Sequence, residues 1–556
     1  MQPLVRRLAR VLYLAATVSL LPMASGTAFA QVGGLDPGTL LRDEALRRER
    51  QDRLKAPAES GFVAPPVPRL HALPSEVEES GPVIEQARIT VVSPAADRLP
   101  DLSSLIERYQ QVPLGEQRLQ LLLRQINARL VQAGLVTGRA VLREVDPEQR
   151  SLRIEIVPGH VEALTERGAA LPERLRHALP LSEGDWLKLA DLEQGIHQIN
   201  RLRLYRAQAS ILPGQTPGGN IIDLELQTGS WWASRIEFDN LGSRRTGSGR
   251  LRGEINLDDR LGWLEAIGLT SLLSEHSEAL LGSISVPQGY STWSATVHAS
   301  RYRFTLLGDR HRGNSRGLTL GWNRVLHLAA EGRDHLDLTL NRTAGYREIE
   351  QTALSPDHVA VVRAAFSRVR REPRLQWLTE AALGVGIDAF GATSDASGLR
   401  RSDIHRQFAK LEGHAGLVWQ PAAQTWSYAL QAAAQYARVA LHASEQLRQG
   451  GFAAVRGVRE DQRFVDRGLL VRHELRFPSL GERSDALAAW SPYLLLDHAR
   501  GSVVGGAWQS LSSVGAGLRW TAARASSELV VARPIDYPAE LGRRHARLHF
   551  TFTLPL

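Results

Sequence analysis

The chain of 556 residues contains no cysteine. This absence excludes disulfide bonds, thiol catalysis and thiolate metal sites. Long apolar runs are also missing beyond the N-terminus, charged residues make up 23% of the chain, and the mean hydropathy is −0.21. These features exclude a bundle of membrane helices. A membrane β-barrel tolerates such a polar average, because half of every strand faces a wet lumen.

Signals for nucleic-acid binding and for catalysis are weak. The net charge is +8, but the basic residues are scattered rather than clustered, so nucleic acid is not an expected partner. Gly313-Asn-Ser-Arg-Gly317 matches the pattern around a hydrolase serine, yet no helix follows it. Gly247-Ser-Gly249 lacks the third glycine of a dinucleotide site, and the 17 histidines form no metalloprotease motif. We therefore predict no enzyme, no cofactor and no metal site.

Residues 1–30 are predicted to be a secretory signal peptide. Arg6, Arg7 and Arg10 supply the positive region, and the apolar run that follows is too short to span a membrane. Ala28-Phe29-Ala30 is a small-residue cleavage site, so the mature chain is expected to begin at Gln31.

Residues 31–55 are predicted to form a charged helix that Asp36 caps. Asp43–Arg47, Glu44–Arg48 and Glu49–Arg53 are spaced as ion pairs four residues apart. A helix that is charged nearly all round lies either in solvent, as a disordered tail does, or in a water-filled hole. Six prolines then make residues 56–82 an extended, semi-rigid linker.

Residues 83–159 and 160–229 repeat one predicted order, β-α-α-β-β. In the first repeat we expect a strand over 83–92, helices over 102–109 and 115–132, and a hairpin over 139–157. The longer helix ends at Gly134, and its buried stripe is predicted to be Leu119, Leu122, Leu123, Ile126 and Leu130. In the second repeat we expect a strand over 161–164, helices over 171–179 and 191–202, and strands over 206–212 and 221–227. Asp191 is the predicted cap of its second helix.

Residues 230–556 show a two-residue period that is typical of many β-strands. In the last predicted strand, Leu548, Phe550, Phe552 and Leu554 alternate with polar residues, and residues 250–257, 336–341 and 469–477 follow the same pattern, with His473 as one misfit. Alternation alone fits both a soluble sandwich and a membrane barrel, whose faces are reversed.

Tryptophan placement favours the membrane barrel over ordinary core packing. Eleven of the twelve tryptophans lie at or beyond Trp231, many near strand ends, as expected for aromatic girdles at the membrane interfaces. At roughly 20 residues per strand with its connection, this region predicts about 16 antiparallel strands.

The set of motifs in this order resembles the two-partner secretion transporters, the TpsB family of filamentous haemagglutinin and haemolysin exporters. The resemblance covers nearly the whole mature chain: helix, linker, two POTRA domains and a transmembrane β-barrel. Residues 151–159 resemble the closing strand of the first POTRA domain, and residues 191–200 resemble a helix of the second. Six residues resemble the family's first barrel hairpin: Asp239, Asn240, Gly242, Thr246, Gly247 and Arg250.

The resemblance also assigns the residues of a long inward-folded extracellular loop. Val455, Arg456 and Gly457 resemble the tip of that loop, and Asp497 stands where the family carries an acidic partner on the barrel wall. Two departures are Val458, where an aromatic residue is usual, which weakens the expected packing of the loop, and the ending Pro555-Leu556, where phenylalanine is common.

The resemblance implies an outer-membrane exporter of a large partner exoprotein, an adhesin, haemolysin or contact-dependent toxin. The POTRA domains lie in the periplasm and capture the partner's N-terminal secretion domain, the helix plugs the pore at rest, and folding outside drives transport. The expected partners are this exoprotein and outer-membrane lipid. Periplasmic chaperones are compatible with this function as further partners. Two alternative functions stay open: a passive porin whose POTRA domains are anchors, and a barrel-assembly factor with POTRA domains. A further alternative is that the POTRA domains are only spacers.

Overall fold

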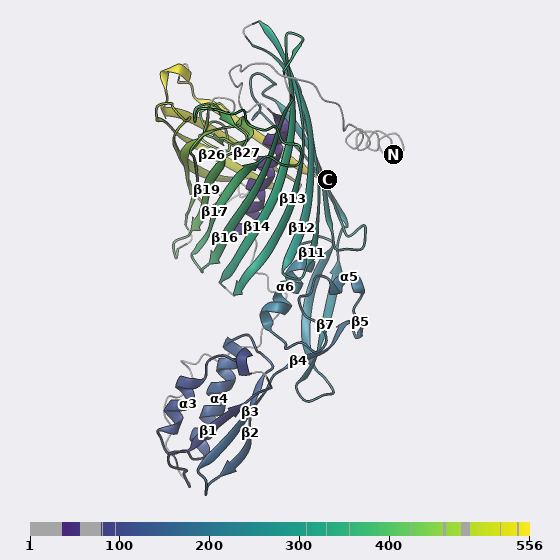
Figure 1. The fold of residues 1–556 in the computed structure, drawn as a ribbon, viewed down its shortest axis with the longest axis vertical. Helices are drawn as coiled ribbons and strands as arrows, with labels where there is room; N and C mark the ends of the chain where they lie inside the picture. The colour runs from purple at the N-terminus through teal and green to yellow at the C-terminus, as the bar shows by residue number, and fades with distance from the viewer. Residues whose placement is uncertain are drawn as a thin grey trace.

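The computed structural model describes residues 36–55, 79, 82–94, 96–306, 308–329, 331–354, 356–423, 425–459, 463–479, 490–522, 524–541 and 544–556. The predicted signal peptide lies outside these residues, as does the linker apart from Glu79 and Pro82. Two small α/β domains stand in a row beneath a barrel, and the helix α2 (Pro37–Lys55) lies inside the barrel (Figure 1).

The first small domain has the predicted order of elements. It consists of β1 (Arg88–Val92), η2 (Ala96–Arg98), α3 (Ser103–Gln110), α4 (Glu116–Gln132), β2 (Arg139–Asp146) and β3 (Ser151–Val157). The sheet order is β1-β3-β2, with β1 parallel and β2 antiparallel to β3. Leu122, Ile126 and Leu130 of α4 are fully buried against this sheet, because residues four apart share one helix face. The first strand begins at Arg88 rather than Val83, since Gln86 adopts a positive φ of 52° in a turn.

The second small domain repeats this order with a short extra strand. It consists of β4 (His160–Glu166), β5 (Ala169–Ala170), α5 (Glu173–Arg176), α6 (Leu189–Asn200), β6 (Tyr205–Pro213) and β7 (Gly219–Thr228). The sheet order is β5-β4-β7-β6, and Leu192, Ile196 and Ile199 of α6 are buried on it.

The two helices of this domain have other first and last residues in the structure than the sequence predicts. The expected helix over 171–179 is only α5, because the Leu171 N–H donates to Leu164 of β4 and Pro172 is extended. Asp191 is not the cap of α6, which starts at Leu189. Its carboxylate instead accepts a hydrogen bond from the Tyr290 hydroxyl, at 2.6 Å, in a turn of the barrel.

The barrel is closed and antiparallel, with sixteen long strands among the described residues, as predicted. The strands are β8 (Trp232–Asp239), β9 (Arg250–Asp258), β10 (Ala266–Ser274), β11 (Ser277–Gln288), β12 (Ser291–Leu306), β13 (Asp309–Ala329), β14 (Gly332–Ile349), β16 (Asp357–Arg371), β17 (Leu375–Ile387), β19 (Ala409–Trp419), β20 (Ser427–Ala437), β24 (Arg467–Arg476), β25 (Trp490–Ser502), β26 (Gln509–Ala522), β27 (Ala525–Asp536) and β28 (Arg547–Pro555). The two-residue β15 (Thr352–Ala353) pairs only with the last two residues of β14, which along the rest of its length pairs directly with β16.

The exposure of the strand side chains shows that the apolar face of the barrel is its outer surface. Leu251, Leu338, Leu469 and Leu548 point outward and are 40–55% exposed. Arg252, Glu474 and His549, on the other face, are buried in the lumen. A soluble sandwich would have the opposite arrangement, so this is a barrel whose outer surface contacts lipid. The misfit His473 lies on the outer face, where its ring contacts the Tyr428 hydroxyl at 2.6 Å.

The barrel closes through a short seam between its first and last strands. Five register pairs join β8 to β28, from Arg235↔Pro555 to Asp239↔Thr551. The ending Pro555-Leu556 takes part in this seam, since the Leu556 N–H donates to the Ser234 carbonyl at 2.9 Å.

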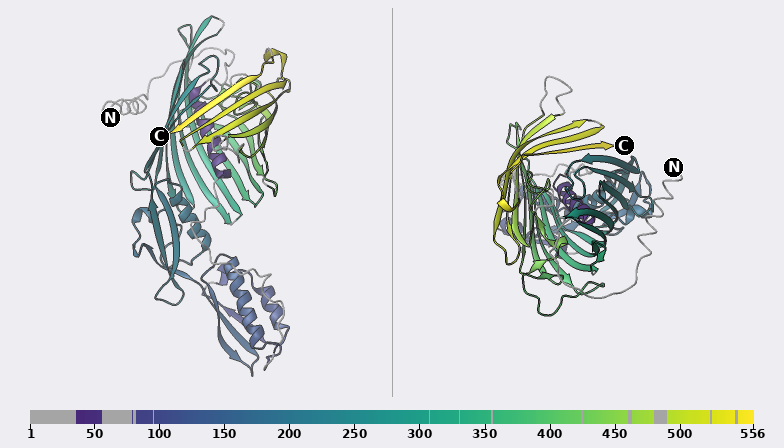
Figure 2. Two further views of the ribbon diagram at one scale, coloured as in Figure 1. Left: turned by 180° about the vertical axis from the view of Figure 1, so that it is seen from behind. Right: turned by 90° about the horizontal axis from the view of Figure 1, so that it is seen from above.

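Helix α2 occupies the lumen, as Figure 2 shows from above. It begins after Asp36 and ends at Lys55, as predicted. Among the described residues, no helix has both the length and the apolar character needed to cross a membrane.

The outward orientation predicts how single charges affect the barrel. Leu320 on β13 is 45% exposed on the outer face, whereas the neighbouring Thr319 lines a lumenal cavity. We expect Leu320→Arg to lower the free energy of unfolding in vesicles by about 2–4 kcal/mol, the cost of arginine in the middle of a lipid-facing strand. We expect Thr319→Arg to cost less than about 1 kcal/mol, because its charge meets a polar lumen. Urea titration of the reconstituted protein measures both, and equal losses would contradict this assignment of the faces.

Candidate functional site

The described residues of the loop between β20 and β24, 438–459 and 463–466, fold into the lumen. It contains β21 (Ala440–Leu441), η3 (Ala443–Glu445), β22 (Leu447–Arg448) and β23 (Phe464–Val465). β21 pairs with β18 (Ile404–His405) of another loop, and β22 pairs with β23. Asp466 secures its base. Its fully buried carboxylate accepts hydrogen bonds from the Leu441 N–H, the Gln446 amide and the Val504 N–H, at 2.8–2.9 Å.

The tip of the loop reaches the barrel wall through Arg456. Its Nε and Nη2 donate to the two carboxylate oxygens of Asp497 on β25, at 2.8 and 2.7 Å, and its backbone N–H donates to the same group at 3.0 Å. Both side chains are fully buried. The structure thus brings together the two residues that the sequence assigned to this contact, as a bidentate pair with planar complementarity.

A second carboxylate, which the sequence analysis missed, completes the partners of Arg456. Glu474 on β24 accepts from Arg456 Nη1 at 2.6 Å and also pairs with Arg476 and Arg519. Arg519 in turn pairs with Glu528 at 2.8 Å and lies over the Tyr493 ring at 4.1 Å. The signal that could have found Glu474 is its lumenal position in the alternation of β24, level with the wall around Asp497.

The neighbours of Arg456 shape the tip. Gly457 has a φ of +113°, and a Cβ there would lie 3.2 Å from Ser513 and 3.3 Å from the backbone of Arg533, so only glycine fits without strain. Its carbonyl accepts from Arg547 Nε at 2.8 Å. Val455 and Val458 are fully buried in a small apolar cluster with Leu470, Ala499, Leu511 and Tyr537. Val458 therefore packs into the core of the loop, where the resemblance leads one to expect an aromatic side chain.

The predicted first-hairpin residues form a second cluster at the ends of β8 and β9. Asp239, fully buried, accepts from Arg250 Nε at 2.7 Å and from Arg250 Nη2 at 3.1 Å. Asn240 joins this hairpin to the last strand, because its amide donates to the Leu548 carbonyl and accepts from the Phe550 N–H, at 2.9 and 2.8 Å. The Asn240 N–H also donates to the Phe550 carbonyl at 3.2 Å, so Asn240 extends the short seam by three further hydrogen bonds.

The remaining first-hairpin residues build the connecting loop. The Gly242 N–H donates to the Ser248 carbonyl, and a Cβ at Gly242 would collide with the Gly247 carbonyl. Gly247 has a φ of +110° and packs against Glu275. The Thr246 carbonyl accepts from the His276 N–H at 2.8 Å, which ties the loop to the β10–β11 turn.

The N-terminus of α2 docks on β12 and β13 through Asp36. Its carboxylate accepts from the Gly38 and Thr39 N–H groups, the predicted cap, and also from the Ser300 and Ser315 hydroxyls. Burial raises the pKa of Asp36, but the hydroxyls of Ser300, Thr39 and Ser315 outweigh this and hold it below its ordinary value. Ser315 belongs to the hydrolase-like Gly313–Gly317 segment, which lies within β13 and here receives the helix.

Charged side chains along α2 contact the barrel wall as well as one another. Of the three pairs predicted within the helix, Glu49–Arg53 forms at 2.6 Å. Glu44 instead contacts Arg250 and Arg252 of β9. Burial raises the pKa of Glu44, but these two arginines hold it well below its ordinary value. Three arginines of the helix pair with the wall at 2.6–2.9 Å: Arg48 with Glu254, Arg50 with Glu380 and Arg53 with Asp337.

The helix also touches the inward loop. Arg42 pairs with Glu445 at 3.8 Å, Asp43 pairs with Arg448 at 3.8 Å, and Arg47 donates to the Ala453 carbonyl at 3.5 Å. Ala453 is three residues before Arg456, and Arg250 of the first hairpin contacts Glu44. The helix therefore links the two clusters of predicted residues.

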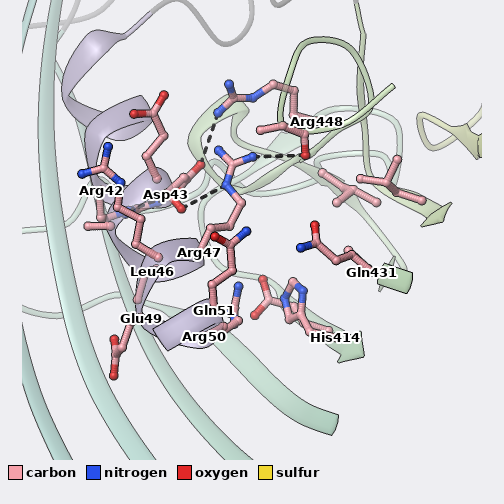
Figure 3. A pocket seen from close by; sticks show the side chains of 18 of the residues that line it. Arg42, Asp43, Leu46, Arg47, Glu49, Arg50, Gln51, His414, Gln431 and Arg448 are labelled. Carbon is pink, nitrogen blue, oxygen red and sulfur yellow. Dashed lines mark hydrogen bonds and ion pairs between the residues drawn. The ribbon is translucent and has the colours of Figure 1, made fainter. Parts of the chain in front are cut away.

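A cavity of about 730 Å³ lies beside the helix. Figure 3 shows Arg47 and Gln51 of the helix on one side, and His414 and Gln431 of the wall on the other. The described residues contain no cluster of three or more histidine, aspartate or glutamate side chains that could hold a metal. Charged side chains of the helix and of the inward loop, among them Arg47 and Arg448, line this cavity in the lumen.

Known families match three regions of the chain. Residues 218–520 match the family described as haemolysin secretion/activation protein ShlB/FhaC/HecB. Residues 89–159 match the ShlB-type POTRA domain, and residues 160–213 match a further POTRA domain family. Both matches fall on the small domains described above.

Individual relatives agree with these matches. The chain is 29% identical over 432 residues to the outer membrane transporter CdiB of Dickeya dadantii, covering 74% of this chain and 75% of that protein. It is 26% identical over 404 residues to the haemolysin transporter protein ShlB of Serratia marcescens, covering 70% of each.

Solved structures show the same fold. CdiB from Escherichia coli superposes with a TM-score of 0.80 at 24% identity, over 93% of this chain and 98% of that chain. CdiB from Acinetobacter baumannii superposes with a TM-score of 0.75 at 16% identity, over 95% of this chain and 100% of that chain. The family match spans more than half of the chain, so the protein belongs to the ShlB/FhaC/HecB family of haemolysin secretion/activation proteins, transporters whose barrel lies in the outer membrane and whose POTRA domains lie in the periplasm.

Proposed function

We propose that this protein exports one large, unfolded exoprotein from the periplasm through its barrel, as the helix α2 leaves the lumen. The observation that carries the proposal is the barrel lumen, because a charged helix occupies it and ion pairs between that helix and the wall hold the helix in place. The cargo is an adhesin, haemolysin or contact-dependent toxin, and two of the relatives above are named as outer membrane or haemolysin transporters. The protein acts without catalysis.

The periplasmic domains offer edges for capture of the cargo. β2 and β6 each lie at the edge of their sheet, so one side of each strand has free backbone groups. Val141 and Val145 on β2 and Leu212 on β6 are 37–44% exposed. An extended segment of the exoprotein's N-terminal secretion domain would add a strand there, with backbone hydrogen bonds for affinity and these apolar residues for selectivity.

The tip contact Arg456–Asp497 is proposed to hold the loop in the lumen while cargo passes. A buried pair that loses one partner leaves the other charge unpaired, so the loop stays inward. The hairpin residues Asp239, Asn240 and Arg250 are proposed to hold the seam closed beside it.

The alternatives predict other behaviour. A passive porin would conduct steadily through an open lumen, whereas α2 fills this one. A barrel-assembly factor would act on other barrels and would secrete no exoprotein.

The first prediction concerns the loop anchor. We expect Arg456→Ala to insert as a folded barrel but to lower secretion of a co-expressed exoprotein to less than about a tenth, because Asp497 and Glu474 lose their buried partner at a cost of about 3–5 kcal/mol. Arg456→Lys is expected to export poorly as well, since a lysine cannot form the bidentate fork. Exoprotein in the medium and on the cell surface is measured by immunoblot.

The matched control is Arg438→Ala, an exposed arginine at the start of the same loop. It is expected to export normally. The double variant Arg456→Ala/Asp497→Ala removes two charges together, so it is expected to be more stable than Arg456→Ala yet equally defective in export. Normal secretion by Arg456→Ala would refute the anchoring role.

The second prediction concerns the plug. A Cβ at Gly38 would lie 3.3 Å from the Ser300 Cβ, close to the roughly 3.5–4.5 Å that a disulfide joins. Because the chain has no cysteine, Gly38→Cys/Ser300→Cys introduces the sole pair, once the His298 ring has turned aside. In the oxidising periplasm we expect this crosslink to fix α2 and to stop export.

Each single cysteine variant serves as the control and is expected to secrete normally. A reductant is expected to restore secretion by the double variant. If the crosslinked protein, verified by its mobility on a non-reducing gel, exports at the wild-type rate, then α2 does not leave the lumen.

A further inference from the structure

Five arginines lie together on the outer surface of the barrel, at the end away from the POTRA domains. They are Arg301 and Arg303 on β12 and Arg310, Arg312 and Arg316 on β13, all exposed. Their strands rise above the rest of the barrel in Figure 1. We call these residues the outer arginine patch.

The strand register places this patch on the lipid-facing side. Val297 and Leu318 are register partners, are 47% and 42% exposed, and lie on the same face as the arginines. Two residues further along each strand stand Ala299 and Arg316, and beyond them the other arginines begin. The patch therefore starts where the apolar band ends, at the level of lipid head groups in the outer leaflet.

Carboxylates stand beside the patch, because Glu348 on β14 is the register partner of Arg312 and the Glu350 carboxylate accepts a hydrogen bond from the Arg310 N–H, but few of them pair with its guanidinium groups. Arg303 and Arg312 are direct register partners, and like charges opposite one another destabilise a sheet. Arg301 pairs with Glu278. Within the described part of the chain, Arg303, Arg310, Arg312 and Arg316 form no ion pair.

Another outward pair of arginines shows the contrast. Arg368 and Arg370 on β16, toward the POTRA end, share Asp334 at 2.8 and 2.9 Å. There the protein provides its own counter-charge. At the outer rim, Arg500 and Arg533 resemble the patch instead. Both are exposed, and their register partners on the neighbouring strands are the apolar Leu469 and Val514.

We propose that the outer arginine patch binds the phosphate groups of the phosphorylated glycolipid of the outer leaflet. Clusters of basic residues next to a membrane attract anionic head groups. A guanidinium binds phosphate through two parallel hydrogen bonds, which suits arginine better than lysine. A phosphate between Arg303 and Arg312 would relieve their mutual repulsion and fix the tall β12–β13 hairpin against the leaflet.

The test measures binding of diphosphorylated lipid A to the purified full-length protein in detergent by native mass spectrometry. Each basic residue near an anionic surface contributes roughly fivefold in affinity. We therefore expect Arg303→Gln/Arg312→Gln/Arg316→Gln to bind at least about tenfold more weakly than the wild type. The matched control, Arg206→Gln/Arg324→Gln/Arg374→Gln, removes three exposed arginines elsewhere on the chain and is expected to bind normally.

Further arms identify the bound group. Lipid A without phosphates is expected not to compete, and millimolar inorganic phosphate is expected not to displace the lipid. The variant Arg303→Lys/Arg312→Lys/Arg316→Lys keeps the charge without the fork and is expected to lose affinity about two- to fivefold. Heat-modifiable gel mobility establishes that each variant is folded, and the lysine variant decides if the glutamine variant does not fold.

Unchanged affinity in the substituted patch, equal loss in the control, equal competition by dephosphorylated lipid or displacement by inorganic phosphate would each overturn the proposal.

Discussion

A guanidinium that is removed from water must have its charge matched, and this requirement organises the lumen around Arg456. The fork of Arg456 is divided between Asp497 and Glu474 on adjacent strands. Glu474 also forms ion pairs with Arg476 and Arg519, and Arg519 forms a further ion pair with Glu528 on another strand. One loop tip is therefore bound to four neighbouring strands, β24 to β27, through a connected set of charges. Such a network specifies one position for the loop, because any shift would leave buried charges without partners.

The alternation of apolar and polar residues along each strand explains why the barrel was predictable. A strand's period of two is local, so Leu548 to Leu554 and residues 469–477 could be assigned to an oily face from sequence alone. The count of about 16 strands followed from length. The helix over 37–55 was predictable too, because Asp36-Pro37 is a local start signal and its charges are within one turn of each other. The pairing of Arg456 with Asp497 came from resemblance, since no local pattern joins residues 41 positions apart.

What sequence reasoning missed lies in long-range contacts. Asp191 has the residue type of a helix cap, but Tyr290 of a barrel turn binds it and α6 starts earlier. Glu44 has an arginine four residues on, but two arginines of β9 are closer to it. Residues 171–179 have leucines four apart, which predicts a helix, but the Leu171 N–H donates to the Leu164 carbonyl of β4. In each case tertiary contacts outweighed a local preference worth about 1 kcal/mol or less.

The loop and the helix differ in how firmly the lumen holds them, and this difference suits their proposed roles. The side chains of Arg456 and Asp497 are at most 1% exposed, whereas Arg48 is 35% and Arg50 18% exposed. Partly exposed pairs contribute about 0–1 kcal/mol each, since water replaces the partner when they separate. Breaking the buried pair costs about 3–5 kcal/mol. Because water that enters beside α2 can solvate its arginines one after another, these contacts suit the proposed departure of the helix in small steps. The loop tip has no such route, which suits its proposed role of staying in the lumen.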